Sequence, residues 1–121
     1  MKESTMDVAD FWTKSWTSDD RVAVRQMLAP DAEIEWNLDA PVDDEELVQV
    51  LHRIAVFADT VTVVGQSRAD DGAALVYDLE APFGTVRMVE FLTVADGRIT
   101  EVRQVYDVTA TDRFFPGLYA N

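Results

Sequence analysis

The chain contains no cysteine and only one histidine among its 121 residues. Without cysteine, disulfide bonds, thiolate metal ligands and cysteine nucleophiles are all excluded. A single histidine also excludes a metal centre built from several histidines. We therefore expect no metal site, and we expect a site chemistry that needs no cofactor.

Positive charge is scarce as well. Ten lysine and arginine residues stand against 23 aspartate and glutamate residues, which gives a net charge of −13. That field repels phosphate backbones and anionic membranes, so nucleic-acid and membrane-surface roles are excluded. No apolar run approaches the ~18 residues of a membrane span. Residues 1–10 lack the pattern of a signal peptide, so we expect a cytoplasmic protein.

The length of the chain and its 48% content of hydrophobic residues predict one globular domain covering residues 1–121. Apolar residues recur at helical spacing in three stretches, which predict helices beginning near Ser4, Ser18 and Asp43. The third helix should bury an apolar stripe, formed by Leu47, Val50, Leu51, Ile54 and Phe57. Alternating apolar and acidic residues at 32–36 predict a short strand between the second and third helices.

From Thr60 the apolar residues alternate with a period of two. This pattern predicts strands near 60–68, 73–80, 85–94 and 98–108, separated by short turns. Asp96-Gly97 between two such runs is a strong hairpin signal, because both residues tolerate positive φ. Helices followed by an antiparallel meander predict an α+β fold with the helices on one face of the sheet.

Glu90 interrupts a strand face that is otherwise apolar, where Met88 and Leu92 flank it. A buried carboxylate costs free energy unless it is paired, hydrogen-bonded or protonated. Glu90 therefore either lines a cavity or points outward in a different strand register.

The order of the elements resembles the nuclear-transport-factor-2-like superfamily, in particular its SnoaL-like branch, over nearly the whole chain. Asp31-Ala32 at the start of the short strand and the closing pattern VEFLTVADGRI carry the resemblance. It implies a cone, in which a bent antiparallel sheet wraps over three N-terminal helices and encloses one pocket. Ketosteroid isomerases, limonene epoxide hydrolases, polyketide cyclases and non-catalytic binding modules share this fold, so the fold alone leaves the activity open.

The resemblance also implies roles for single positions. Glu90 matches the protonated aspartate in the oxyanion hole of ketosteroid isomerases, where a neutral acid donates a hydrogen bond. The proton-shuttling aspartate of those enzymes is replaced by Trp36 and Asn37. Val76 replaces an arginine of limonene epoxide hydrolases, and Gln104 replaces their second carboxylate and the acid/base aspartate of SnoaL-type cyclases. None of the three constellations is intact.

Asp78 falls near a carboxylate of the limonene epoxide hydrolases, and it shares one strand face with Val76 and Glu80. If that face is concave, Asp78 and Glu90 reach one cavity, with Asp78 as the base and Glu90 as the neutral acid. The alternative is that Asp78 faces solvent while Tyr77 and its apolar neighbours face the core.

The expected substrate-binding residues are polar or aromatic side chains beside these carboxyls: Tyr106, Gln104, Trp12, Trp16, Trp36 and Met88. Trp12 and Trp16 lie four apart on one helix face, as core residues or as a pocket wall. His52 lies off the apolar stripe and is expected at a boundary. The apolar residues 114–119 would close the mouth of the cone or cover a dimer interface.

We expect a protein that binds a small hydrophobic organic molecule, as a cofactor-free acid/base isomerase, cyclase or hydrolase. The alternative is a non-catalytic module for ligand binding or dimerisation. In either case we expect a homodimer formed through the sheet.

Overall fold

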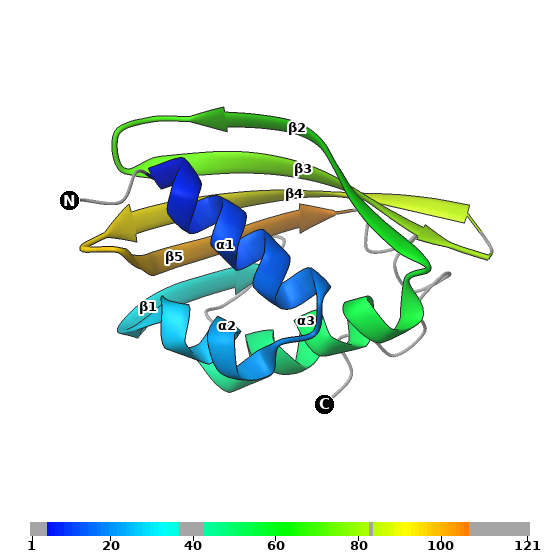
Figure 1. The fold of residues 1–121 in the computed structure, drawn as a ribbon, viewed down its shortest axis with the longest axis horizontal. Coiled ribbons are helices and arrows are strands. Elements are labelled where there is room, and N and C mark those ends of the chain that lie inside the picture. The colour runs from blue at the N-terminus through cyan, green and yellow to red at the C-terminus, as the bar shows by residue number, and fades with distance from the viewer. Residues whose placement is uncertain (1–4, 37–42, 83, 107–121) are drawn as a thin grey trace.

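The computed structural model describes residues 5–36, 43–82 and 84–106. Three helices pack on a five-stranded sheet (Figure 1). The helices are α1 (Thr5–Thr17), α2 (Arg21–Met27) and α3 (Asp44–Phe57). The strands are β1 (Leu28–Trp36), β2 (Thr60–Arg68), β3 (Gly72–Ala81), β4 (Gly84–Ala95) and β5 (Arg98–Tyr106). Asn37, the end of the strand predicted at 98–108 and the apolar residues 114–119 lie outside the described residues.

Aspartates begin two of the helices. Asp20 and Asp43 each accept a hydrogen bond from a backbone N–H in the first turn of α2 and α3, respectively. Ser18, which we predicted to cap the second helix, instead donates to the carbonyl oxygen of Lys14 at 2.7 Å and so closes α1. Asp19, with φ of 59°, reverses the chain between the two helices, and the cap of α2 therefore falls at Asp20.

The sheet has the strand order β1-β5-β4-β3-β2. Strands β2 to β5 form the predicted antiparallel meander. Asp96 and Gly97 both have positive φ (54° and 74°), as a tight hairpin turn requires. Strand β1 differs from the antiparallel expectation, since it joins the free edge of β5 in parallel. Helix α3 separates β1 from β2 in the chain, so β1 cannot form a hairpin with the meander.

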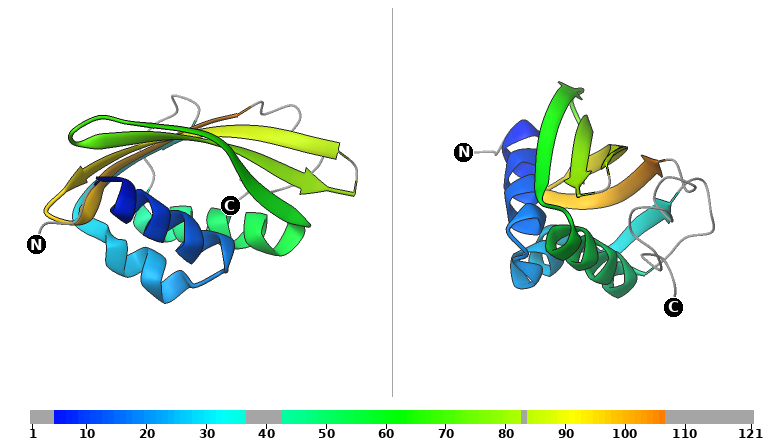
Figure 2. Two further views of the ribbon diagram at one scale, coloured as in Figure 1. Left: turned by 45° about the horizontal axis from the view of Figure 1, so that its top comes forward. Right: turned by 90° about the vertical axis from the view of Figure 1, so that its right-hand side faces the viewer.

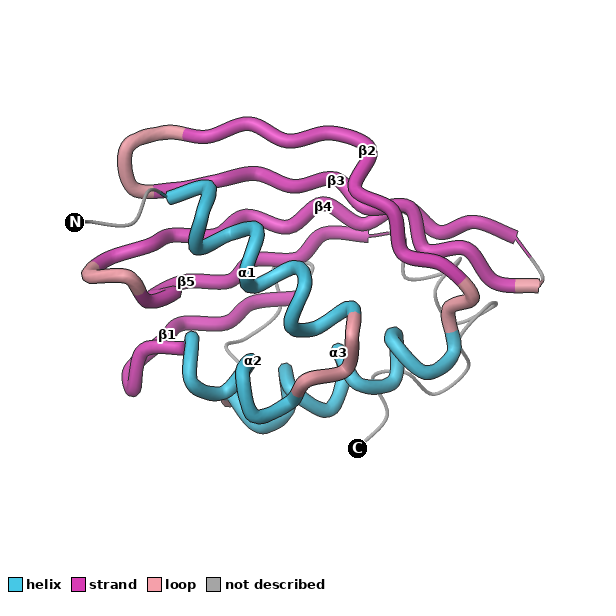
Figure 3. Tube along the Cα trace, in the orientation of Figure 1, coloured by secondary structure: helices cyan, strands magenta, loops and turns pink. Residues whose placement is uncertain are grey.

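The sheet is curved, and all three helices lie on its concave side (Figure 2). Figure 3 shows this segregation of the helices from the strands. The α+β fold predicted from the sequence is thus confirmed. Among the described residues, no helix combines the length and the apolar character needed to cross a membrane.

The core lies between the helices and the concave face of the sheet. Side chains on this inner face alternate with exposed or half-buried ones along β3 and β4, and the buried ones are Ala73, Leu75, Tyr77, Leu79, Val86, Met88, Glu90 and Leu92. Helix α3 buries its apolar stripe as far as Ile54. Phe57, which we expected in that stripe, is 60% exposed because it is the last residue of α3, where the chain leaves the helix.

Candidate functional site

Glu90 lies in the middle of the inner face of the sheet. It is opposite Leu75 of β3 and Gln104 of β5 in the strand register. Its exposed fraction is 0%, so the register that would turn it outward is excluded. A carboxyl at this position is out of contact with solvent and depends on protein groups for its hydrogen bonds.

Three side chains from three different elements donate hydrogen bonds to Glu90. Trp12 Nε1 from α1 and Tyr77 OH from β3 donate to Oε1, at 3.0 and 2.9 Å. Gln104 Nε2 from β5 donates to Oε2 at 2.8 Å. The hydroxyl of Thr13 lies 2.9 Å from the hydroxyl of Tyr77 and extends the network toward the outside. We call these five residues the Glu90 cluster.

Burial and hydrogen bonding act on Glu90 in opposite directions. Burial raises the pKa of its carboxyl above the ordinary value, and the donors Gln104, Tyr77 and Trp12 only partly offset that rise. The pKa of the Tyr77 phenol is also raised well above its usual value, first by burial and then by the neighbouring charge of Glu90. The cluster therefore combines a carboxyl that takes up a proton readily with a phenol that keeps its own.

Tyr77 and Thr13 were not predicted as site residues from the sequence. Tyr77 was expected only in the core, because an aromatic ring on an inward face is typical of a core. The available signal was its hydroxyl, since a buried tyrosine needs a hydrogen-bond partner. Glu90 lies on the same face of the neighbouring strand and supplies that partner.

Asp78 does not join this cluster. It lies on the outer face of the sheet, where Arg87, its cross-strand partner on β4, donates two hydrogen bonds to it at 2.7 and 3.0 Å. The Arg87 guanidinium lowers the pKa of Asp78. The expectation that Asp78 and Glu90 reach one cavity is therefore wrong. The alternative orientation, with Tyr77 facing the core, is confirmed.

The expected substrate-binding residues all lie on the concave side of the sheet. Trp12 and Gln104 bind Glu90, and the ring of Trp16 meets Tyr77 edge-on, with centroids 5.2 Å apart. Met88 and Tyr106 face each other in the register, both buried, and Trp36 is partly buried against the core. Their contacts with a substrate stay a prediction.

One atom of the cluster has an unused hydrogen-bonding capacity. Gln104 Oε1 is buried and has no hydrogen-bond partner among the described residues. A buried carbonyl oxygen without a partner is costly. Either a hydroxyl of a bound molecule or, after rotation of the amide, the acid proton of a neutral Glu90 would satisfy it.

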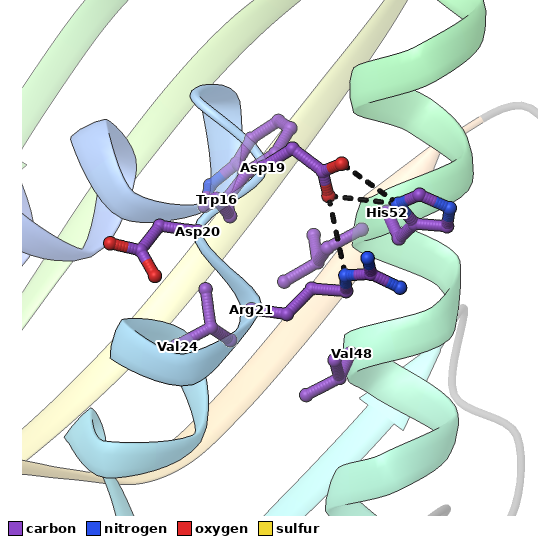
Figure 4. Close-up of a pocket in the computed structure, with 8 residues that line it drawn as sticks. Trp16, Asp19, Asp20, Arg21, Val24, Val48 and His52 are labelled. Carbon is purple, nitrogen blue, oxygen red and sulfur yellow. Dashed lines mark hydrogen bonds and ion pairs between the residues drawn. The ribbon is translucent and has the colours of Figure 1, made fainter.

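A shallow hollow lies at the junction of the three helices, outside the Glu90 cluster (Figure 4). Its empty volume of about 150 Å³ includes space that is open to solvent. His52 Nδ1 lies 2.8 and 3.0 Å from the carboxylate oxygens of Asp19, and Arg21 Nε lies 3.9 Å from the same carboxylate. These groups bind one another and fasten the turn between α1 and α2 to α3. Within the described residues, no cluster of three potential metal ligands is present.

No protein-family model matches the chain, and no curated protein sequence matches it either. Solved structures match it closely in shape. A protein from Kribbella flavida is 22% identical, with a TM-score of 0.80 and 93% of each chain covered. A steroid delta-isomerase from Pseudomonas aeruginosa is 11% identical, with a TM-score of 0.79 over 98% of this chain and 90% of the other.

An NTF2-like protein from Cytophaga hutchinsonii is 13% identical, with a TM-score of 0.73, covering 91% of this chain and 96% of the other. The chain has the nuclear-transport-factor-2-like fold. Identities of this size establish the fold alone, so the SnoaL-like branch stays a prediction.

Proposed function

We propose that the protein binds a small, largely apolar organic molecule on the concave side of its sheet and exchanges a proton with it through Glu90. The observation that carries this proposal is a fully buried carboxyl that holds three side-chain donors at the centre of the core. An apolar side chain at this position would pack without the cost of desolvation. Buried acids with raised pKa values are typical of functional sites.

A single carboxyl fits some reactions better than others. Among the described residues, no second charged carboxylate contributes to the pKa of Glu90, and Asp78 lies on the other side of the sheet. Hydrolysis by two carboxylates is therefore disfavoured. An isomerisation suits one carboxyl, because the proton taken from one carbon is returned to another and the enzyme ends unchanged. Among the three reaction types expected, we propose a cofactor-free isomerase.

The surroundings of Glu90 support an apolar ligand with one polar group. Met88, Trp16 and Tyr106 are buried apolar or aromatic side chains on the same side of the sheet. Gln104 Oε1 is available to accept a hydrogen bond from a hydroxyl of the ligand. Two proteins of similar structure are a steroid delta-isomerase and a protein with a ketosteroid isomerase-like fold that was solved in complex with trimethylamine.

The test is a thermal-shift screen against steroids, polyketide-like ketones, epoxides and fatty acids, followed by turnover assays on any ligand found. A ligand at ~100 times its Kd adds about 2.7 kcal/mol, which is on the order of 10 °C for a domain of this size. Glu90→Gln should retain binding and lose roughly 10²–10⁴-fold in turnover. Asp78→Asn is the matched control and should leave turnover unchanged.

Two results would contradict the proposal. Full turnover in Glu90→Gln would remove this residue from the chemistry. A well-folded protein that no compound class stabilises would indicate a core filled by its own side chains, and the protein would then be a non-catalytic module.

A second candidate function, dimerisation, is favoured by the outer face of the sheet. Val76, Val89 and Val105 lie in one row across β3, β4 and β5, and Phe91 beside them is 45% exposed. A contiguous apolar patch on an exposed sheet is typical of an interaction surface.

We propose a second copy of the chain as the occupant of this patch. Each flank of the valine row carries an acid and an arginine, Asp78 with Arg87 on one side and Glu101 with Arg103 on the other. A self-complementary contact between two copies can place an acid of one copy beside an arginine of the other. Light scattering should give twice the monomer mass for the wild type and the monomer mass for Val89→Lys. A monomeric wild type would reject the dimer.

A further inference from the structure

We propose that the hydroxyls of Tyr77 and Thr13 form a proton path that connects the buried carboxyl of Glu90 with solvent beside α1. The path has two short steps. Tyr77 OH lies 2.9 Å from Glu90 Oε1, and Thr13 Oγ1 lies 2.9 Å from Tyr77 OH. Glu90 and Tyr77 are fully buried, whereas Thr13 is partly exposed. Two hydroxyls thus span the distance from the centre of the core to the surface.

The other partners of Glu90 cannot carry a proton in this way. Trp12 Nε1–H and Gln104 Nε2–H are donors that have no lone pair to receive a proton at the same atom. A hydroxyl donates and accepts through one oxygen, so it can receive one proton while it releases another. Among the contacts of Glu90 within the described residues, Tyr77 is the only hydroxyl.

The direction of the hydrogen bonds matches proton uptake. Tyr77 donates to Glu90, so its oxygen is free to accept from Thr13. A proton from solvent binds Thr13 Oγ1 while the hydroxyl proton of Thr13 moves to Tyr77 and that of Tyr77 moves to Glu90 Oε1. One proton enters the carboxyl, both hydroxyls stay neutral, and their orientation is reversed. Release of a proton runs through the same atoms in the opposite order.

The electrostatics of the cluster support a concerted transfer. The pKa of Tyr77 is held well above its usual value, so a free phenolate does not accumulate as an intermediate. Among the described residues, Tyr77 is the titratable group that touches Glu90, and the other two hydrogen-bond partners of Glu90, from α1 and β5, are uncharged. The role of this path rests on the proposed function, in which Glu90 exchanges a proton with a ligand. An acid that is sealed from solvent must regain any proton that it loses.

The experiment follows hydrogen–deuterium exchange at the carboxyl itself and needs no ligand. The carbonyl stretch of a protonated carboxyl shifts to lower frequency when its proton is replaced by deuterium. Stopped-flow infrared spectroscopy after mixing with D₂O measures the rate of this shift, at a pH below the titration midpoint of the same band. The band is assigned to Glu90 by its loss in Glu90→Gln.

Three substitutions on α1 distinguish the effect of the Thr13 hydroxyl on the exchange rate from the effect of the packing around it. Thr13→Val has nearly the same shape without the hydroxyl, and we expect it to slow exchange roughly tenfold or more. Thr13→Ser retains the hydroxyl and should exchange at the rate of the wild type. Thr17→Val is the matched control, because the Thr17 hydroxyl donates to the Thr13 carbonyl oxygen at 2.7 Å and not to the cluster. It should also leave the rate unchanged.

Equal rates in Thr13→Val and the wild type would overturn the proposal, since exchange would then occur through local opening of the core. A Thr13→Ser variant as slow as Thr13→Val would overturn it too, because the packing rather than the hydroxyl would set the rate. If Thr13→Val does not fold, Thr13→Ala replaces it with the same expected slowing. These outcomes are independent of the ligand screen, so the path and the proposed function fail separately.

Discussion

The two faces of one hairpin, β3–β4, hold two carboxyls in opposite environments. On the inner face, Glu90 is completely buried and receives hydrogen bonds from neutral donors. On the outer face, Asp78 binds the guanidinium of Arg87, whose side chain is 64% exposed. The pKa of Glu90 is raised and that of Asp78 is lowered.

The contrast shows that the number of hydrogen bonds does not by itself decide whether the pKa of a carboxyl is raised or lowered. Glu90 accepts three hydrogen bonds and Asp78 accepts two from its arginine, yet the more heavily bonded group is the one that favours its proton. Where solvent is excluded, desolvation outweighs hydrogen bonding and raises the pKa of the carboxyl. A cation beside a carboxylate that solvent can reach lowers the pKa instead. Tyr77 and Asp78 are adjacent in the chain and belong to these two different environments.

The largest difference between the two faces should be the loss of stability when the carboxyl on each face is removed. Glu90→Ala leaves the buried donors of Trp12 and Gln104 without their acceptor. We expect it to lower the free energy of unfolding by about 3–5 kcal/mol. Asp78→Ala leaves only Arg87, which solvent can hydrate, so its effect should be much smaller than that of Glu90→Ala. Urea denaturation of both variants makes the comparison. Equal losses in free energy of unfolding would show that the hydrogen bonds of Glu90 contribute no more to stability than the surface pair of Asp78 and Arg87.

Much of the fold could be predicted because its signals are local. Asp96-Gly97 specifies its turn through its own backbone preferences, and Asp43 caps α3 through a contact with Glu46 in the first turn. Local patterns could not show that β1 pairs in parallel with β5, because that contact joins distant parts of the chain. The cap of α2 was assigned to Ser18 because the left-handed turn at Asp19 has no distinct sequence signal.

The candidate site was predicted only in part. Glu90 was found because a charge in an apolar strand face needs an explanation, and that reasoning holds wherever the face is buried. Asp78 was placed on the wrong face because the family resemblance was preferred over its apolar neighbours, Leu75 and Leu79, which both face the core. Tyr77 was missed because its hydroxyl acquires a role only through contacts with α1 and β4.

The pH dependence of stability should have opposite signs on the two faces. The raised pKa of folded Glu90 means that the folded state binds a proton more tightly than the unfolded chain. Stability is therefore lost as the pH rises above the ordinary value of 4.5 toward the folded value. The loss is about 1.4 kcal/mol for each pH unit that separates the pKa of the folded state from that of the unfolded chain.

The lowered pKa of Asp78 acts in the other direction, and its contribution is present above 3.8 and lost as the pH falls through the folded value. Urea titrations across this range should show that Glu90→Gln removes the loss at higher pH and that Asp78→Asn removes the loss at lower pH. A parallel shift of both profiles would contradict the assignment of the two pKa directions.

The smallest expected difference between the two faces is the response of their stability contributions to salt. The Asp78–Arg87 pair lies at the surface, where mobile ions screen its attraction within a Debye length of about 8 Å at physiological ionic strength. Any stability difference between the wild type and Arg87→Gln should therefore vanish as the salt concentration rises. The difference between the wild type and Glu90→Gln should persist, because ions do not enter the core around Glu90. The measurement is a salt series of urea denaturations for both variants, and a salt-sensitive Glu90→Gln difference would mean that solvent reaches the inner carboxyl.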